Sequence, residues 1–256
     1  MKQPYIISVV NQKGGVGKTT TVHNLASFLG RKHRVLAIDM DPQASLTIGT
    51  GLDPDDKKNV VTAINGTSLA SIIVKRNNFM LLPGSIVLSE FDVSFSSVMG
   101  REMMLKKLIK PIEKEYDFIL IDCQPTLALS TVNSLVASDK LLIPQQTEFF
   151  SMKGLELVLQ AIQNIKDNDL NNNLDILGIV LTLCDKRKTL HKDVVEVLRD
   201  NFPELVMDTI IRSNVDLASA PSHYSSIFDY APKSKGAIDY EALGKEFLKR
   251  LKKGAK

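Results

Sequence analysis

Residues 11–21 read NQKGGVGKTTT and decide the fold. They follow a short apolar run at residues 6–10 and precede a stretch with helical spacing of its apolar side chains. Glycines allow the backbone to turn so that successive N–H groups point inward and surround phosphate oxygens. The N-terminus of the following helix adds a partial positive charge. A strand, a glycine-rich loop and a helix in this order predict a phosphate-binding P-loop.

The end of this loop carries the two side chains that such a site requires. We expect Lys18 to reach the β- and γ-phosphates of a nucleotide and the Thr19 hydroxyl to bind Mg²⁺. The predicted nucleotide-binding residues are Gly14, Gly15, Val16, Gly17, Lys18, Thr19 and Thr20. The loop departs from the G-x-x-x-x-G-K-[ST] pattern, because Gln12 replaces its first glycine and a second lysine, Lys13, precedes the glycine pair.

The rest of the chain alternates between two patterns. Near-continuous apolar runs, typical of strands buried on both faces of a parallel sheet, occur at residues 6–10, 35–38, 80–82, 118–121, 141–143, 176–181 and, more weakly, 205–207. Helical spacing occurs at residues 18–32, 101–115, 153–166 and 191–201. We therefore predict one α/β domain over residues 1–256, with a doubly wound, mostly parallel sheet. Residues 42–78 are expected to form loops and short helices near the site.

Length and composition limit the class of protein. A chain of 256 residues can bury a core without disulfide bonds, and its two cysteines, Cys123 and Cys184, cannot form a disulfide framework. We interpret both as small buried residues of a cytoplasmic protein. The first residues do not resemble a signal peptide, and no apolar stretch approaches the roughly 20 residues that span a bilayer.

The net charge of +3 is unevenly distributed. Residues 233–256 contain eight Lys and Arg against three Asp and Glu, which gives this segment +5 and leaves −2 on residues 1–232. Such an asymmetry indicates an anionic partner, which would be nucleic acid or a membrane. The alternative is a solvated terminal helix with a basic end.

Four segments together resemble one family. Residues 13–19, KGGVGKT, resemble the deviant Walker A motif of the ParA/MinD group of ATPases. Residues 38–43, IDMDPQ, resemble the A′ motif in its ParA (Soj) form, and residues 121–125, IDCQP, resemble the Walker B segment. Residues 220–223, APSH, are similar to a C-terminal segment of Soj-like partition proteins.

The resemblance implies roles for four charged residues. Lys13 would reach the phosphates of the partner subunit in an ATP-bound dimer, as a cation acting in trans. Asp41 would orient the attacking water. Asp39 would belong to the Mg²⁺ shell, and Asp122 would be the Walker B aspartate. The last three follow apolar runs, so they are expected at the carboxyl edge of the sheet, where α/β proteins bind ligands.

This chain differs from the family at two places. Gln124 stands where relatives have proline, which affects the path of the loop after Asp122. Relatives also place proline before arginine in the segment that, with Thr182, flanks the base, whereas here Arg212 precedes Ser213. The choice of ATP over GTP is therefore implied by the family and not by these residues.

The two best-known branches of the group bind different surfaces. MinD-type members bind membrane through an amphipathic C-terminal helix, and Leu243, Phe247 and Leu251 share one helix face here. We expect this face to dock on the sheet instead, because the lysines after Leu251 are followed by no further large apolar group. Partition-type members bind DNA. The candidate DNA contacts are Lys186, Arg187, Lys188, Lys192, Lys235, Lys249, Arg250, Lys252 and Lys253.

The resemblance thus implies a weak, Mg²⁺-dependent ATPase that forms an ATP-bound sandwich homodimer and binds double-stranded DNA without sequence preference. A ParB-like centromere-binding partner would stimulate hydrolysis and so drive plasmid or chromosome partition at the nucleoid. A MinD-like positioning protein that binds membrane is the alternative.

Overall fold

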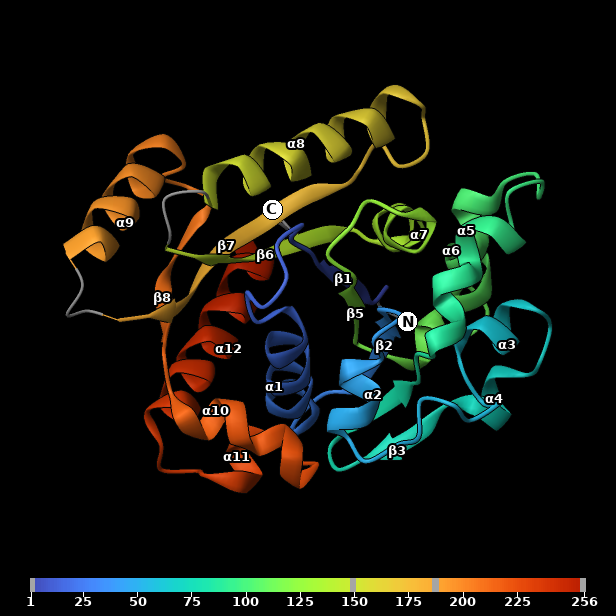
Figure 1. Ribbon diagram of the computed structural model, residues 1–256, viewed down its shortest axis with the longest axis horizontal. Coiled ribbons are helices and arrows are strands. Elements are labelled where there is room, and N and C mark those ends of the chain that lie inside the picture. The colour runs from blue at the N-terminus through green and yellow to red at the C-terminus, as the bar shows by residue number, and fades with distance from the viewer. Residues whose placement is uncertain (1–2, 148–150, 186–188, 254–256) are drawn as a thin grey trace.

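The sheet is built around the strand that precedes the P-loop. The computed structural model describes residues 3–147, 151–185 and 189–253, with backbone alone at 151–153 and 189–193. Over these residues the strand order is β3-β4-β2-β5-β1-β6-β7-β8, and β3 alone runs antiparallel to its neighbour (Figure 1). The strands are β1 (Tyr5–Val9), β2 (Val35–Met40), β3 (Val74–Arg76), β4 (Phe79–Leu82), β5 (Phe118–Cys123), β6 (Lys140–Gln146), β7 (Asp175–Cys184) and β8 (Val206–Arg212).

Helices cover both faces of this sheet. The α-helices are α1 (Lys18–Gly30), α2 (Ser45–Gly49), α3 (Val60–Ile64), α4 (Leu69–Ile72), α5 (Phe91–Ser94), α6 (Met104–Ile109), α7 (Leu129–Ala137), α8 (Ser151–Asp167), α9 (Thr189–Asn201), α10 (Val215–Ser219), α11 (Ile227–Tyr230) and α12 (Lys235–Lys253). Short 3₁₀ turns are η1 (Ile86–Glu90), η2 (Arg101–Met103), η3 (Glu113–Glu115) and η4 (Ala220–His223). The predicted single-domain, doubly wound α/β fold is confirmed.

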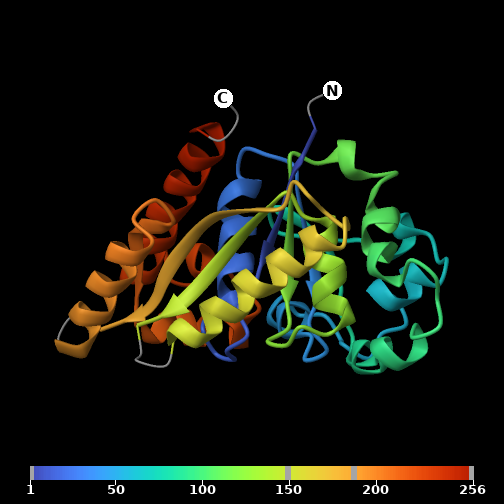
Figure 2. The same cartoon turned by 90° about the horizontal axis from the view of Figure 1, so that it is seen from above.

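Each face of the sheet has its own core. One apolar cluster joins the sheet to α3, α6, α7, α8 and α9, and a second joins it to α1, α10, α11 and α12. In Figure 2 the yellow α8 and the red α12 accordingly lie on either side of the strands. Because parallel strands need crossover connections, both faces are covered and the strands are apolar on both sides. The predicted runs were near-continuous for this reason.

The expected helix at residues 101–115 is wrong. The chain forms the turn η2, then α6, and then the separate turn η3. Pro111 follows α6 closely, and because proline has no backbone N–H and its ring clashes with the preceding turn, the helix cannot continue through it.

Residues 42–78 contain short helices, as expected, but also a strand that the apolar pattern did not predict. Strand β3 pairs with β4 through a two-residue turn, since Arg76 lies opposite Phe79. Asn77 adopts a φ of 40°, which asparagine tolerates better than most residues. The adjacent asparagines of this turn were the missed signal.

Helix α1 buries one titratable side chain against the sheet. His23 is 7% exposed, and its ring contacts the edge of Phe79 with centroids 5.8 Å apart. Burial lowers the pKa of His23 to about 4, and the nearby Asp229 opposes the shift only in part. The neutral imidazole is therefore the form that the folded chain accommodates.

This burial predicts a pH dependence of stability. Between about pH 6.5 and 4 the unfolded chain binds a proton at His23 and the folded chain does not, so the free energy of unfolding should fall as pH falls through this window. The full shift corresponds to about 3 kcal/mol, of which about 2 kcal/mol is lost by pH 5.0. Urea unfolding at pH 7.5 and 5.0 should show a smaller difference for His23→Gln than for the unaltered protein. Equal differences for the two proteins would contradict the assignment.

Candidate functional site

The P-loop between β1 and α1 has the backbone conformation that the glycines predicted. Gly15 has a φ of 72° and Gly17, which caps α1, has a φ of 88°, both in the left-handed region that glycine adopts without strain. A Cβ atom placed on Gly14, Gly15 or Gly17 would have no heavy atom within 4 Å. The loop therefore faces open space with its main chain exposed.

Neighbouring strands hold the second half of this loop. The Thr182 hydroxyl at the end of β7 donates to the Val16 carbonyl oxygen at 2.8 Å, and the Gln146 side chain at the end of β6 donates to the Gly15 carbonyl oxygen at 3.3 Å. Because these two carbonyl groups are fixed by hydrogen bonds from β6 and β7, the backbone of the phosphate cradle is preorganised without a ligand.

Lys18 is 6% exposed at the start of α1. Its Nζ donates to the Lys13 carbonyl oxygen at 3.1 Å, so the two lysines of the loop contact each other through one main-chain group. Burial lowers the pKa of Lys18, while the negative charges of Asp122 and Asp41 favour its charged form. The ammonium group thus lies within a cluster of carboxylates at the carboxyl edge of the sheet.

Asp122 ends β5 and is fully buried. Neither of its carboxylate oxygens has a hydrogen-bond partner. Burial raises the pKa of Asp122 well above its ordinary value and the carboxylate of Asp39 raises it further, whereas the Thr19 hydroxyl and the Lys18 ammonium, near the carboxylate but outside hydrogen-bond geometry, favour the charged form. A buried carboxylate without a partner is unfavourable, and a cation in front of it would satisfy both oxygens.

Asp39 lies directly opposite Asp122 on the adjacent strand β2, but both of its carboxylate oxygens accept hydrogen bonds. Oδ2 accepts from the backbone N–H and the hydroxyl of Thr47, at 2.9 and 2.7 Å, and Oδ1 accepts from the Asp41 N–H at 3.2 Å. Burial nevertheless raises the pKa of Asp39 to about 6. A Cβ atom on Gly84 would lie 2.8 Å from Asp39 Cγ, so the loop after β4 can pass only as glycine.

Asp41 follows β2 and is 8% exposed. Its Oδ1 accepts from the Gln43 N–H at 2.9 Å, and its own N–H is held by Asp39. The chain then turns through Ala44, which has a φ of 48°, into α2. Asp39 therefore positions the backbone that carries Asp41, a role that the sequence did not reveal because Thr47 lies in a segment without regular patterning.

The residues present fit a magnesium–nucleotide site. Among the described residues, no three His, Cys, Asp or Glu side chains are grouped as metal ligands. A magnesium ion here would be held by Thr19 and the unpartnered Asp122, with further oxygens from water and phosphate, which suits the few direct carboxylates that Mg²⁺ uses in such sites.

Comparison with known proteins agrees with this geometry. Residues 4–176 match the family described as AAA domain. The chain is 38% identical over 248 residues to the sporulation initiation inhibitor protein Soj of Bacillus subtilis, covering 94% of this chain and 97% of that protein. The chain belongs to the ParA/Soj family of partition ATPases.

Two solved structures of this P-loop NTPase group are similar throughout. Cobyrinic acid a,c-diamide synthase of Mycobacterium smegmatis, solved with an ATP analogue and magnesium, is 32% identical with a TM-score of 0.85, over 98% of this chain and 97% of that one. A putative plasmid partition protein of Borrelia burgdorferi bound to AMPPNP is 27% identical with a TM-score of 0.80, over 97% and 100%.

The basic residues predicted as ParA-type DNA contacts differ in their surroundings. Lys235, Lys249, Lys252 and Lys253 are exposed on α12. Lys186, Arg187 and Lys188 lie outside the described residues, as does the side chain of Lys192 on α9.

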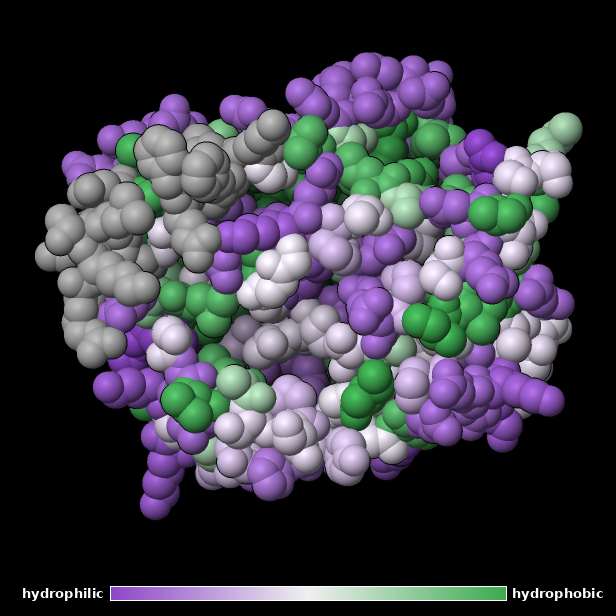
Figure 3. Space-filling model, viewed as in Figure 1, coloured by the Kyte–Doolittle hydropathy of each residue, from purple (hydrophilic) through white to green (hydrophobic). Residues whose placement is uncertain are grey.

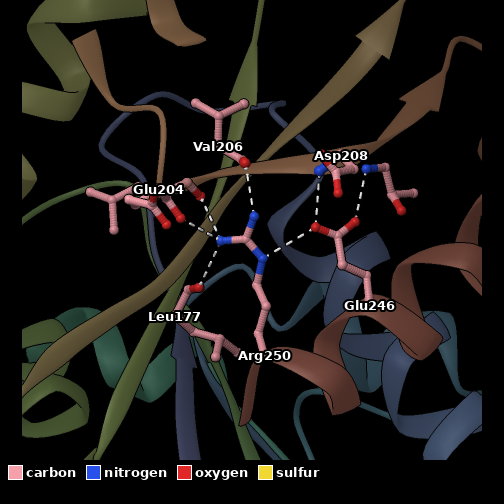
Figure 4. A network of polar contacts seen from close by, with 8 residues as sticks. Leu177, Glu204, Val206, Asp208, Glu246 and Arg250 are labelled. Atoms are coloured by element: carbon pink, nitrogen blue, oxygen red, sulfur yellow. Dashed lines mark hydrogen bonds and ion pairs between the residues drawn. The ribbon is translucent and has the colours of Figure 1, made fainter. Parts of the chain in front are cut away.

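Arg250 has structural partners within the chain. Its guanidinium donates to the carbonyl oxygens of Leu177, Glu204, Leu205 and Val206 and pairs with Glu246 at 3.1 Å (Figure 4). Glu246 in turn accepts from the backbone N–H groups of Asp208 and Thr209 on the outer strand β8. This network fastens α12 along the sheet edge and engages all three guanidinium nitrogens of Arg250 within the chain, which favours a structural role over DNA contact.

Arg212, which lies where relatives have a proline followed by arginine, also has a structural partner within the chain. Its guanidinium makes a bidentate pair with Asp239 on α12, with distances of 2.6 and 2.9 Å, and its N–H donates to the same carboxylate. Asp239 and Glu246 were not singled out from the sequence, because carboxylates on a charged helix are usually solvated.

Cys123 and Cys184 are both buried, as expected.

The unpartnered carboxylate predicts a gain in stability on its removal. Without Mg²⁺ and nucleotide, Asp122→Asn should raise the free energy of unfolding by about 1–3 kcal/mol, because a buried carboxyl group whose ionisation is unfavourable there is replaced by a neutral amide. Thermal unfolding in EDTA measures this. The control Asp117→Asn, which removes an exposed carboxylate paired with Arg34 at 3.0 Å, should give no gain. A destabilised Asp122→Asn protein would contradict the interpretation.

Proposed function

We propose that this chain binds Mg²⁺–ATP at the P-loop and hydrolyses it slowly. The observation that carries the proposal is the open glycine cradle beside the buried Lys18 and the unpartnered Asp122. The cradle suits phosphate oxygens, and Asp122 suits a metal ion. Asp41, fixed through Asp39, would orient the attacking water. One similar structure solved with an ATP analogue and magnesium, and another solved with AMPPNP, support the choice of ATP.

We propose further that ATP joins two copies of the chain and that Lys13 of each acts on the nucleotide of the other. Lys13 stands before two exposed glycines at the open side of the loop, where a second copy could approach. Since the transferred phosphoryl group carries negative charge in the transition state, a cation delivered by dimerisation would make hydrolysis depend on assembly.

The loaded dimer is proposed to bind double-stranded DNA without sequence preference. The α12 basic face, which we define as Lys249, Lys252 and Lys253, is exposed and rigidly fixed by the Arg250 network. Contacts to phosphate would give affinity without base recognition. Two such faces in a dimer would bind far more strongly than one. A ParB-like protein would stimulate hydrolysis and release the DNA at the nucleoid.

The MinD-like alternative lacks a supporting observation. Leu243, Phe247 and Leu251 of α12 are no more than 3% exposed, so the apolar side of the helix is packed on the sheet and α1. No helix within the described ranges has the length and hydropathy to cross a membrane. On the face drawn in Figure 3, hydrophilic side chains surround scattered apolar patches and do not leave one continuous apolar surface.

Two substitutions should separate binding from hydrolysis. Lys18→Ala is expected to abolish nucleotide binding, because it removes the ammonium group from the cradle. Asp41→Ala should still bind ATP, dimerise and bind DNA while hydrolysing ATP at least about tenfold more slowly. Fluorescent-nucleotide titration, light scattering and phosphate release measure these properties. Normal hydrolysis by Asp41→Ala would refute the water-orienting role.

Substitution of the lysines on α12 tests the DNA-binding surface separately from the Arg250 network that supports it. Replacing Lys249, Lys252 and Lys253 by alanine should weaken ATP-dependent binding to linear double-stranded DNA and reduce its salt dependence, with unfolding unchanged. The control replaces Lys57, Lys58 and Lys75, exposed lysines elsewhere, and changes net charge equally. Arg250→Ala should instead lower stability by about 2 kcal/mol or more. Equal loss of DNA affinity in both lysine triples, or binding to liposomes alone, would contradict the proposal.

A further inference from the structure

A buried asparagine lies behind the first half of the P-loop. Asn11, between β1 and the glycines, is 1% exposed. Its Nδ2 donates to the Pro144 carbonyl oxygen at 2.8 Å and to Gln145 Oε1 at 2.9 Å, both on β6. Gln145 is also 1% exposed, so this anchor is shielded from water on both sides. Such a buried amide is held in one orientation by its partners.

The other end of the Asn11 side chain holds Lys13. Asn11 Oδ1 accepts from the Lys13 backbone N–H at 2.9 Å, in the i to i+2 pattern of an Asx turn. The next two residues are Gly14 and Gly15, which are exposed and have no Cβ atom to restrict them. Without a fixed point in front of them, the backbone direction at Lys13 would be poorly determined.

We propose that Asn11 is a positioning residue for Lys13, transferring the rigidity of β6 to the backbone that aims the Lys13 side chain. This inference rests on the proposed role of Lys13 in hydrolysis. The Lys13 carbonyl oxygen accepts from Lys18, a group that is itself expected to bind phosphate. The contact from Asn11 to the Lys13 N–H involves no such group, so it can persist when nucleotide is bound.

Different residues hold the first and second halves of the P-loop, so the role of Asn11 can be tested separately from nucleotide binding. Thr182 and Gln146 hold the carbonyl groups of Val16 and Gly15, which shape the phosphate cradle. Loss of Asn11 leaves these contacts in place. Removing Asn11 should therefore disturb the aim of Lys13 more than the binding of ATP, and kcat should fall while KM changes little.

The first measurement uses the full chain without nucleotide. Hydrogen exchange at the Lys13 amide should become at least about tenfold faster in Asn11→Ala, because its acceptor is gone. Asn11→Ser keeps a hydroxyl that can accept from the same N–H, and it should restore part of the protection. Unchanged exchange in Asn11→Ala would overturn the proposal.

The second measurement is ATP turnover with Mg²⁺ and double-stranded DNA. Asn11→Ala should lower kcat by about 10²-fold, as expected for a misplaced catalytic group, with KM within about threefold. The double variant Asn11→Ala, Lys13→Ala should be no slower than Lys13→Ala, because both changes remove one effect. Losses that multiply, or a raised KM with normal kcat, would overturn the proposal.

A matched control separates positioning from general loss of structure. Asn133 on α7 is fully buried and makes the same kinds of contact, with Nδ2 donating to two backbone carbonyl oxygens and Oδ1 accepting from the Leu105 N–H. Asn133→Ala should lose comparable stability but keep kcat per folded molecule. An equal fall in kcat in this control would overturn the inference.

Failure of the proposed function would give a different result from failure of the inference about Asn11. If Lys13→Ala hydrolyses ATP at the normal rate, the role of Lys13 in hydrolysis is refuted, and the positioning role falls with it. If Lys13→Ala is slow and Asn11→Ala is not, the proposed function stands and only the inference about Asn11 is refuted.

Discussion

The arrangement depends on the electrostatic strain of two buried carboxylates held side by side at the end of a parallel sheet. Strands β2 and β5 pair in register so that Asp39 and Asp122 lie opposite each other, and both are fully buried. Burial raises the pKa of both carboxyls; the charge of Asp39 raises that of Asp122 further, and the charge of Asp41 adds to the rise at Asp39. Asp39 is stabilised by three hydrogen bonds, whereas Asp122 has none. Such a site is tolerated because the surrounding core is stable enough, and a cation in front of Asp122 would satisfy the carboxylate oxygens that have no partner.

Around this pair, one set of residues fixes the backbone and another carries the side chains proposed to act on the nucleotide. Thr182 and Gln146 hold the P-loop from β7 and β6, and Asn11, within the loop, is anchored on β6 and holds Lys13. Thr47 and Gly84 hold the carboxylate that positions Asp41. None of these five residues would contact the phosphates as proposed. They fix the geometry of Lys18, Lys13 and Asp41, for which small displacements matter most.

Helix α12 is the corresponding support on the outer edge of the sheet. The carboxylates of Asp239 and Glu246 accept from N–H groups of β8, and Arg250 donates to carbonyl groups where β8 begins. An outer strand otherwise presents unpaired backbone groups that favour aggregation. The same contacts fix the orientation of the α12 basic face. Part of the uneven charge is therefore structural, which the net charge of the segment does not reveal.

The sequence by itself determined the fold class, a doubly wound and mostly parallel sheet, and the position of the P-loop between the first strand and the first helix. Buried parallel strands require continuous apolar runs, and a phosphate cradle requires glycines followed by Lys18 and Thr19, so both patterns are local. The broken helix at Pro111 and the hairpin at Asn77 also had local signals. Only the tertiary structure decided that Asp122 lacks a partner, that Thr47 donates to Asp39, that Arg250 supports β8 and that Asn11 is anchored on β6. These features depend on how residues from different elements meet, and no periodicity records which polar groups will do so.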